Sequence, residues 1–121
     1  MILRVIFKYL CVLIYVMDDR IIGLVGEAKL VNSKIFSLPR LLILMSLENL
    51  GQDGATFTEL RAGLDLKDGI LHSNLKTLKE MGYIAERKVK LEKKTLKSYS
   101  MTEEGREALL TARNWFRKWL S

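Results

Sequence analysis

A change of hydrophobic period at Gly82 constrains the fold of this chain more strongly than any other feature of its sequence. Before Gly82, the leucines at positions 71, 75 and 78 have the spacing of one face of an α-helix. After it, residues 83–91 alternate between two sets as in a β-strand, and residues 96–101 form a second candidate strand beyond a turn at 92–94. The sequence therefore predicts a helix over residues 67–81 that is followed directly by a two-stranded hairpin.

Two earlier segments carry the signals of helices. Ser37 and Leu38 precede a proline, which suits a first helical turn, and the helix is predicted to end at Gly51. Its expected apolar face consists of Leu41, Leu42, Leu44, Met45, Leu47 and Leu50. Residues 55–57 are compatible with a short strand, and Thr58 is the predicted N-cap of a brief helix over residues 59–63.

A long terminal helix is predicted after the hairpin. Thr102 is its expected N-cap, and two glutamates follow in the first turn, where carboxylates interact favourably with the helix dipole. The predicted elements are, in order, a helix, a short strand, two helices, a hairpin and a further helix. This is the order of a winged helix-turn-helix, a mainly α fold with a β-hairpin wing (α+β). We expect this domain over residues 38–102, an N-terminal accessory or dimerisation element over 1–37, and a C-terminal dimerisation helix over 103–121.

The first 17 residues are strongly apolar, but their longest uncharged run, residues 9–17, has only nine residues. A membrane-spanning helix needs about 20. Three interpretations stay open: the segment packs against a partner subunit, it is a weak membrane anchor, or the native product starts at Met17. Residues 18–36 are predicted to form one helix, or two shorter pieces broken at Gly23 and Gly26.

The positive charge of the chain is concentrated in the predicted hairpin. The net charge is +6, and residues 87–97 contain one acid and six bases: Arg87, Lys88, Lys90, Lys93, Lys94 and Lys97. A basic patch of this kind favours a polyanionic partner such as nucleic acid. The alternative is a hairpin whose charges are merely solvated.

Cysteine and histidine each occur once, which limits the chemistry that this chain can perform. A disulfide within one chain is excluded, and Cys11 with His72 cannot supply the roughly four ligands of a zinc site without carboxylates or a second subunit. A reducing, cytoplasmic location fits this usage, and no metal or cofactor is expected. We expect no enzymatic activity, because His72 lies on a predicted exposed helix without a nucleophile motif and no glycine-rich phosphate loop occurs.

Three groups of residues resemble one family of regulators. They are Phe57-Thr58-Glu59-Leu60, the run from Asp68-Gly69 through Gly82-Tyr83-Ile84, and Tyr99 to Arg106, read as YSMTEEGR. Together they resemble the MarR/ArsR-like winged helix-turn-helix transcriptional regulators, in particular the small stand-alone archaeal and bacterial members, over about residues 38–110. The chain departs from the family pattern at Lys67, where Thr or Ser is usual, at His72, where Ser is common, and at Asn74, where His is common. These departures bear on base preference rather than on fold.

The second helix of a helix-turn-helix enters the major groove of DNA, so the helix over residues 67–81 is the expected recognition helix. Its candidate contacts are Lys67, Gly69, His72, Ser73, Lys76 and Thr77, and the alternative for them is an ordinary solvated face. The six basic hairpin residues are expected to lie along the backbone or in the adjacent minor groove. There they would add affinity without sequence specificity.

The terminal helix carries three large aromatic residues, Trp115, Phe116 and Trp119, which predict a dimer interface; the alternative is that they pack on the chain's own core. The resemblance implies a homodimer that binds two half-sites of double-stranded DNA about one turn apart. It also implies that a small-molecule effector could bind at the dimer interface, although no residue identifies one. Contact with a membrane is not expected. The rival function is a winged helix that binds proteins without intrinsic DNA specificity, and RNA is a weaker alternative.

Overall fold

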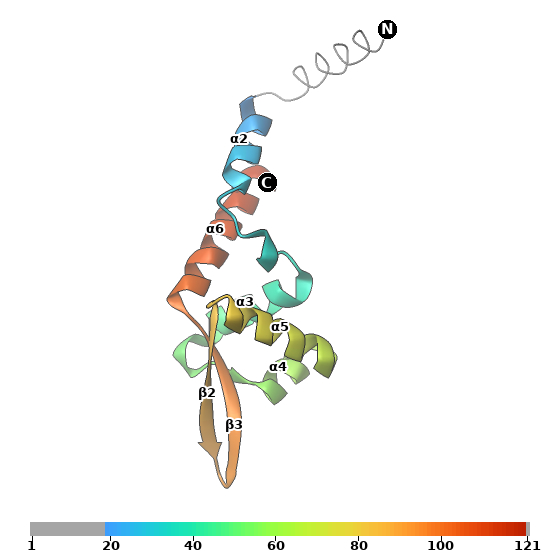
Figure 1. The fold of residues 1–121 in the computed structure, drawn as a ribbon, viewed down its shortest axis with the longest axis vertical. Coiled ribbons are helices and arrows are strands. Elements are labelled where there is room, and N and C mark those ends of the chain that lie inside the picture. The colour runs from blue at the N-terminus through green and yellow to red at the C-terminus, as the bar shows by residue number, and fades with distance from the viewer. Residues whose placement is uncertain (1–18, 121) are drawn as a thin grey trace.

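The computed structural model describes residues 19–120 (Figure 1), so the predictions for residues 1–17 lie outside the described part of the chain. The helices are α2 (Asp19–Ala28), α3 (Leu38–Leu50), α4 (Phe57–Leu64), α5 (Asp68–Glu80) and α6 (Glu103–Leu120), with 3-10 turns η1 (Ser33–Ile35) and η2 (Gly51–Asp53). The strands are β1 (Ala55–Thr56), β2 (Ile84–Leu91) and β3 (Lys94–Met101). The predicted winged helix fold of class α+β is confirmed. Within residues 19–120, no helix is both long and apolar enough to cross a membrane.

The hydrophobic core forms around α3, which packs against α4, α5, α6 and β3. Its completely buried side chains are Ile43, Leu44 and Leu47, and Ile43 was not among the residues predicted for this face. Met45 and Leu50, which were predicted to be buried, are 41% and 47% exposed. The two positions lie about 140° apart around the helix, outside the arc that Ile43, Leu44 and Leu47 bury, and Leu50 borders a recess that α4 also lines. The start and end of α3 agree with the prediction: Ser37 Oγ accepts a hydrogen bond from the N–H of Arg40, and Gly51 is the C-cap.

The sheet has the order β1-β3-β2, and both pairs of strands are antiparallel. Leu91 pairs with Lys94, so the hairpin turn consists of residues 92 and 93 alone and is tighter than predicted. Glu92 adopts a φ of 59° there, a conformation that a two-residue hairpin turn needs and that favours glycine. The short β1 pairs with β3 at Ala55–Tyr99 and Thr56–Ser98, which attaches the wing to the helical core.

Two predicted helix boundaries are corrected by the structure. The N-cap of α4 is Thr56, not Thr58: Thr56 Oγ1 accepts from the N–H of Glu59 at 3.2 Å, and the Glu59 carboxylate accepts from the N–H of Thr56 at 3.4 Å. This reciprocal pair is a capping box, and it starts the helix two residues earlier than expected. In the N-terminal region α2 continues through Gly23 and Gly26 and ends at Ala28, so neither predicted arrangement of residues 18–36 is right.

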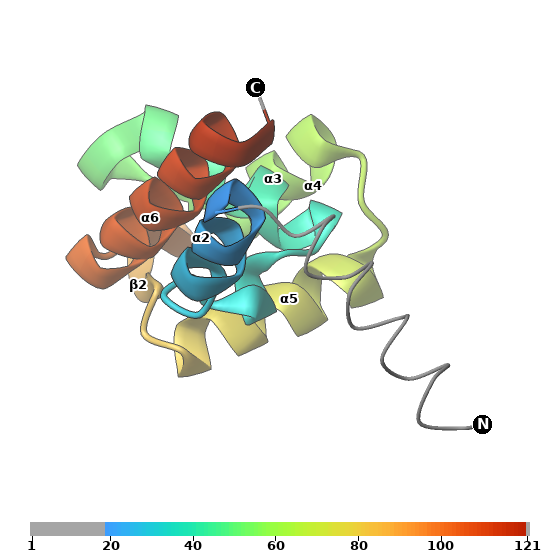
Figure 2. The ribbon, with the colours of Figure 1, turned by 90° about the horizontal axis from the view of Figure 1, so that it is seen from above.

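The helices α2 and α6 lie side by side at the end of the molecule opposite the tip of the wing (Figures 1 and 2). Gly23 permits this approach, because a Cβ at this position would lie 3.2 Å from the ring of Trp119. The Lys118 ammonium pairs with the Glu27 carboxylate at 2.6 Å, and the Trp119 indole donates to the same carboxylate at 3.0 Å. These two bonds hold the pKa of Glu27 below its usual value.

Candidate nucleic-acid interface

The helix α5 buries one side in the core and exposes the other. The three leucines predicted for its inner face are at most 2% exposed. Five of the six residues predicted to contact DNA from this helix are exposed, namely Lys67, Gly69, His72, Ser73 and Lys76. Thr77 is half-buried, and its hydroxyl donates to the Ser73 carbonyl at 3.1 Å. Lys67 occupies the N-cap position and makes no capping hydrogen bond through its side chain.

All six basic residues of the wing are exposed, but the sheet divides them between its faces. Residues that pair directly across an antiparallel ladder share a face, and successive residues alternate between faces. Glu86 pairs with Tyr99 and Lys88 pairs with Lys97, so Lys88, Lys90 and Lys97 lie on the face that meets α5. Arg87 and Lys94 lie on the opposite face, where the Arg87 guanidinium donates to the Gln52 carbonyl at 3.1 Å. Lys93 lies in the turn.

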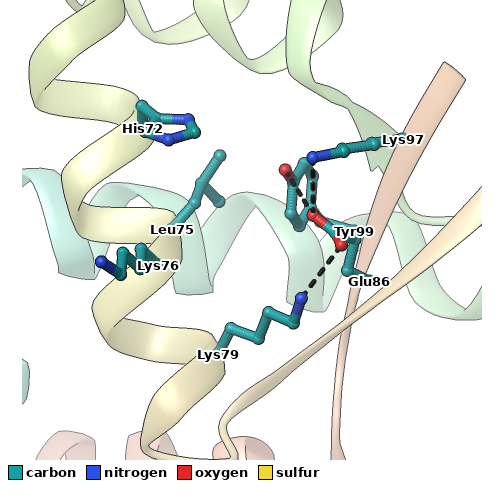
Figure 3. Close-up of a pocket in the computed structure, with 7 residues that line it drawn as sticks. All are labelled: His72, Leu75, Lys76, Lys79, Glu86, Lys97 and Tyr99. Atoms are coloured by element: carbon teal, nitrogen blue, oxygen red, sulfur yellow. Dashed lines mark hydrogen bonds and ion pairs between the residues drawn. The ribbon is translucent and has the colours of Figure 1, made fainter.

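A recess of about 160 Å³ separates α5 from the wing (Figure 3). On the helix side it is lined by His72, Leu75, Lys76 and Lys79, and on the sheet side by Glu86, Lys97 and Tyr99. The Glu86 carboxylate accepts from Lys79 Nζ at 3.0 Å and from the Tyr99 hydroxyl at 3.0 Å, and it lies 3.9 Å from Lys97 Nζ. Lys79, Glu86 and Tyr99 were not among the predicted site residues, because only the sheet register and the packing of α5 against the sheet bring them together.

The electrostatics of the recess keep Glu86 ionised and Tyr99 protonated. The hydrogen bond from Lys79 is the largest influence on Glu86 and lowers the pKa of its carboxyl group. Burial, followed by the hydrogen bond to Glu86, raises the pKa of Tyr99 to about 12. The phenol therefore remains a hydrogen-bond donor to the carboxylate over the whole physiological range of pH.

Alkaline titration should reveal this phenol directly. We expect one tyrosine to ionise near pH 12, rather than near the ordinary value of 10.0, in a titration followed by phenolate absorbance. Because the folded pKa lies above the unfolded one, the contribution of Tyr99 to stability is complete below about pH 10 and is lost between about pH 10 and 12. The variant Tyr99→Phe should lack the late step. Identical titration curves for both proteins would contradict the assignment.

Arg40 on α3 is a further residue at this surface that was not predicted. Its Nε donates to Asn74 Oδ1 at 3.0 Å, and Asn74 Nδ2 donates in turn to the Ile70 carbonyl at 2.8 Å. These bonds fasten the exposed side of α5 to the start of α3. No local pattern identifies the pair, because its members lie 34 positions apart. Within residues 19–120, no group of three or more His, Cys, Asp or Glu side chains could hold a metal ion.

The three aromatic residues assigned to a dimer interface are half-buried against the chain itself. The Trp115 indole donates to the Leu24 carbonyl at 3.3 Å, and the Trp119 indole bonds to Glu27. Phe116 packs edge-on against Phe36, with ring centroids 5.0 Å apart. The alternative interpretation, packing within the chain, therefore describes what these side chains do in the structure. Their contact with a second copy stays a prediction.

A helix with an exposed polar face beside a lysine-rich hairpin defines a winged helix domain of the nucleic-acid-binding class. Comparison with known proteins agrees. Residues 40–120 match the family described as winged helix DNA-binding domain, and because this match spans most of the chain, the chain belongs to that family.

Solved structures resemble the fold at low sequence identity. One is "Putative transcriptional regulator ytfH from Salmonella typhimurium", with a TM-score of 0.56 and 19% identity, covering 70% of this chain and 76% of that one. Another is smu.1704 from Streptococcus mutans UA159, with a TM-score of 0.56 and 18% identity, covering 67% of this chain and 79% of that one. No curated protein sequence matches the chain. At such identities the two structures support the fold alone, and the MarR/ArsR-like subtype stays a prediction.

Proposed function

We propose that this protein is a sequence-specific transcriptional regulator of the MarR/ArsR-like type that binds double-stranded DNA as a homodimer. In this proposal α5 enters the major groove, and the wing over residues 87–98 contacts the backbone or the adjacent minor groove. We further propose that the protein is not an enzyme. One observation carries the proposal: the exposed face of α5 and the lysine-rich face of the wing border the same recess, so that one duplex could contact both (Figure 3).

The direct test is binding of the purified full chain to duplexes selected from a random-sequence pool, measured at two salt concentrations with and without competitor DNA. Phosphate contacts release counterions, and the affinity should therefore fall steeply with salt. A preferred sequence should also survive excess competitor. A folded protein that binds no duplex at low salt would overturn the proposal and favour the rival function, a protein-binding winged helix.

The proposed dimer would form through the paired helices α2 and α6 rather than through the tryptophan side chains alone. The apolar side chains of Ile22 and Val25 are 58% and 45% exposed on α2, and Leu120 is 64% exposed at the end of α6. Exposed apolar residues gathered at one end of a small domain support an interface. Sedimentation of the full chain at micromolar concentration should show a dimer, and a monomer alone would contradict this part of the proposal.

Gly69 provides a test of close contact between α5 and DNA. A Cβ at this position would meet nothing within 4 Å, and alanine favours a helix over glycine by up to about 1 kcal/mol. We therefore expect Gly69→Ala to raise the thermal midpoint slightly while lowering DNA affinity, since the new methyl group would occupy space that the backbone leaves to the duplex. Both quantities are measured on one preparation, by thermal melting and by fluorescence anisotropy. Unchanged affinity would remove Gly69 from the contact surface.

A further inference from the structure

The recess between α5 and the wing lies between the two elements that are proposed to contact neighbouring grooves of DNA. If α5 lies in the major groove and the wing in the neighbouring minor groove, the sugar-phosphate strand that divides the two grooves has to pass between them. The recess occupies that place in the protein, since α5 contributes one wall and strands β2 and β3 contribute the other (Figure 3).

Two of the three lysines that line this recess contact a single acid. Lys79 from α5 and Lys97 from β3 both direct their ammonium groups toward Glu86 on β2, as Figure 3 shows. The Lys79 and Lys97 side chains remain 52% and 57% exposed, whereas that of Glu86 is only 22% exposed. Each ammonium has three N–H donors, and one contact with Glu86 leaves donors of both lysines available to an anion. Two lysines and one glutamate leave the cluster with a charge of +1.

The acid itself is held in place from the core side. The Tyr99 hydroxyl donates to the second carboxylate oxygen of Glu86 at 3.0 Å, and Tyr99 is only 5% exposed. Both oxygens of Glu86 thus accept hydrogen bonds, one from the recognition helix and one from the central strand. A lysine side chain that is already restrained loses less rotamer freedom when it binds an anion. Without the acid, Lys79 and Lys97 would repel each other and extend into water.

We propose that this recess is the subsite for one DNA backbone phosphate, and that Glu86 is a positioning residue that holds Lys79 and Lys97 ready to bind it. The inference rests on the proposed DNA-binding function. It assigns to an acidic residue in the DNA-facing surface a role that favours binding, although its own charge is repelled by DNA.

His72 lies on the rim of the same recess and faces Phe57, with ring centroids 6.4 Å apart.

The variant Glu86→Gln separates positioning from simple charge. Lys79 and Tyr99 bond to different oxygens of Glu86, and glutamine has an NH2 group in place of one of these oxygens, so one of the two acceptor positions is lost. Loss of a negative charge alone would strengthen DNA binding. Loss of positioning should instead weaken binding about 5- to 10-fold at 0.1 M salt, with the slope of log affinity against log salt reduced by about 0.9, the value of one phosphate contact.

Glu80→Gln is the matched control. Glu80 is exposed at the end of α5, next to Lys79, and its side chain makes no ion pair or hydrogen bond among the residues that the structure describes. We expect this variant to bind DNA as tightly as the wild type or more tightly. Tyr99→Phe removes one hydrogen bond from Glu86 without changing any charge, and it should weaken binding in the same direction as Glu86→Gln but less.

Each variant is measured at a temperature where circular dichroism shows it to be folded, on a duplex selected for tight binding by the wild type. Weakened binding with a reduced salt slope for Glu86→Gln, but not for Glu80→Gln, would support the proposal. Binding by Glu86→Gln that equals or exceeds that of the wild type would overturn it and leave the DNA-binding function intact. A wild-type protein that binds no duplex at low salt would instead overturn the proposed function.

Discussion

The variant Gly105→Ala is expected to destabilise the fold by about 3 kcal/mol, as overpacking against rigid neighbours does. A Cβ at Gly105 would lie 2.1 Å from the carbonyl oxygen of Tyr83, and a backbone atom cannot move aside as a flexible side chain can. The same carbonyl accepts from the N–H of Thr102 at 3.1 Å, and the Thr102 hydroxyl donates to the Gly82 carbonyl at 2.6 Å. Displacing the start of α6 would therefore break these two hydrogen bonds, which connect the start of this helix to the residues just before β2.

Thermal and urea unfolding measure this effect. A loss of this size should lower the thermal midpoint by roughly 10 °C in a domain of this length. Gly63→Ala is the control, since a Cβ at Gly63 in α4 would meet nothing within 4 Å. That variant should be as stable as the wild type or up to about 1 kcal/mol more stable. If both variants unfold at the midpoint of the wild type, the close approach of α6 to Tyr83 is not present in solution.

Replacing both lysines at the tip of the wing should weaken DNA binding uniformly. If Lys93 and Lys94 each neutralise one phosphate, the double variant Lys93→Gln, Lys94→Gln loses about 50-fold in affinity at 0.1 M salt, and its salt slope falls by about 1.8. The loss should be similar for preferred and unrelated duplexes, because phosphate contacts carry no sequence information. Fluorescence anisotropy over a salt series on two duplexes measures both quantities.

Unlike the double variant at the tip of the wing, Ser73→Ala and Lys76→Ala on α5 should change which DNA sequences the protein prefers, since base contacts specify the sequence. We expect each variant to change the ranking of the selected duplexes by affinity, with a change of about 1–3 kcal/mol in binding free energy at one base-pair position. Lys29→Gln removes an exposed lysine directly after α2, the helix that lies at the end of the molecule opposite the tip of the wing (Figure 1), and should change DNA affinity by less than about two-fold, because salt screens distant exposed charges. The assigned roles of wing and helix would be reversed if the tip variant changed the sequence preference and the α5 variants lost affinity equally for all duplexes.

The candidate site could be predicted in part. The basic hairpin and the exposed residues of α5 follow from composition and from the leucine spacing, because both are local properties of the chain. The recess could not be predicted, since the sequence around Glu86 shows only an acidic residue near several basic ones and does not indicate its contacts. Its role depends on Tyr99, with which it pairs across the sheet, and on Lys79, which α5 brings to 3.0 Å. The division of the wing lysines between two faces likewise depends on the register.

The sequence by itself determined the order of helices and hairpin and most of their ends, including the caps at Ser37 and Thr102. These features depend on residues within one or two turns of each other, and short-range periodicity and capping are therefore sufficient. Only the tertiary structure decided where Trp115 and Trp119 pack, since their partners on α2 lie 91 and 92 positions away. It also decided that β1 joins the wing and that Glu86 lies between two lysines. Contacts of this kind depend on how separate elements dock, and docking is set by the shape of the whole core rather than by any local segment.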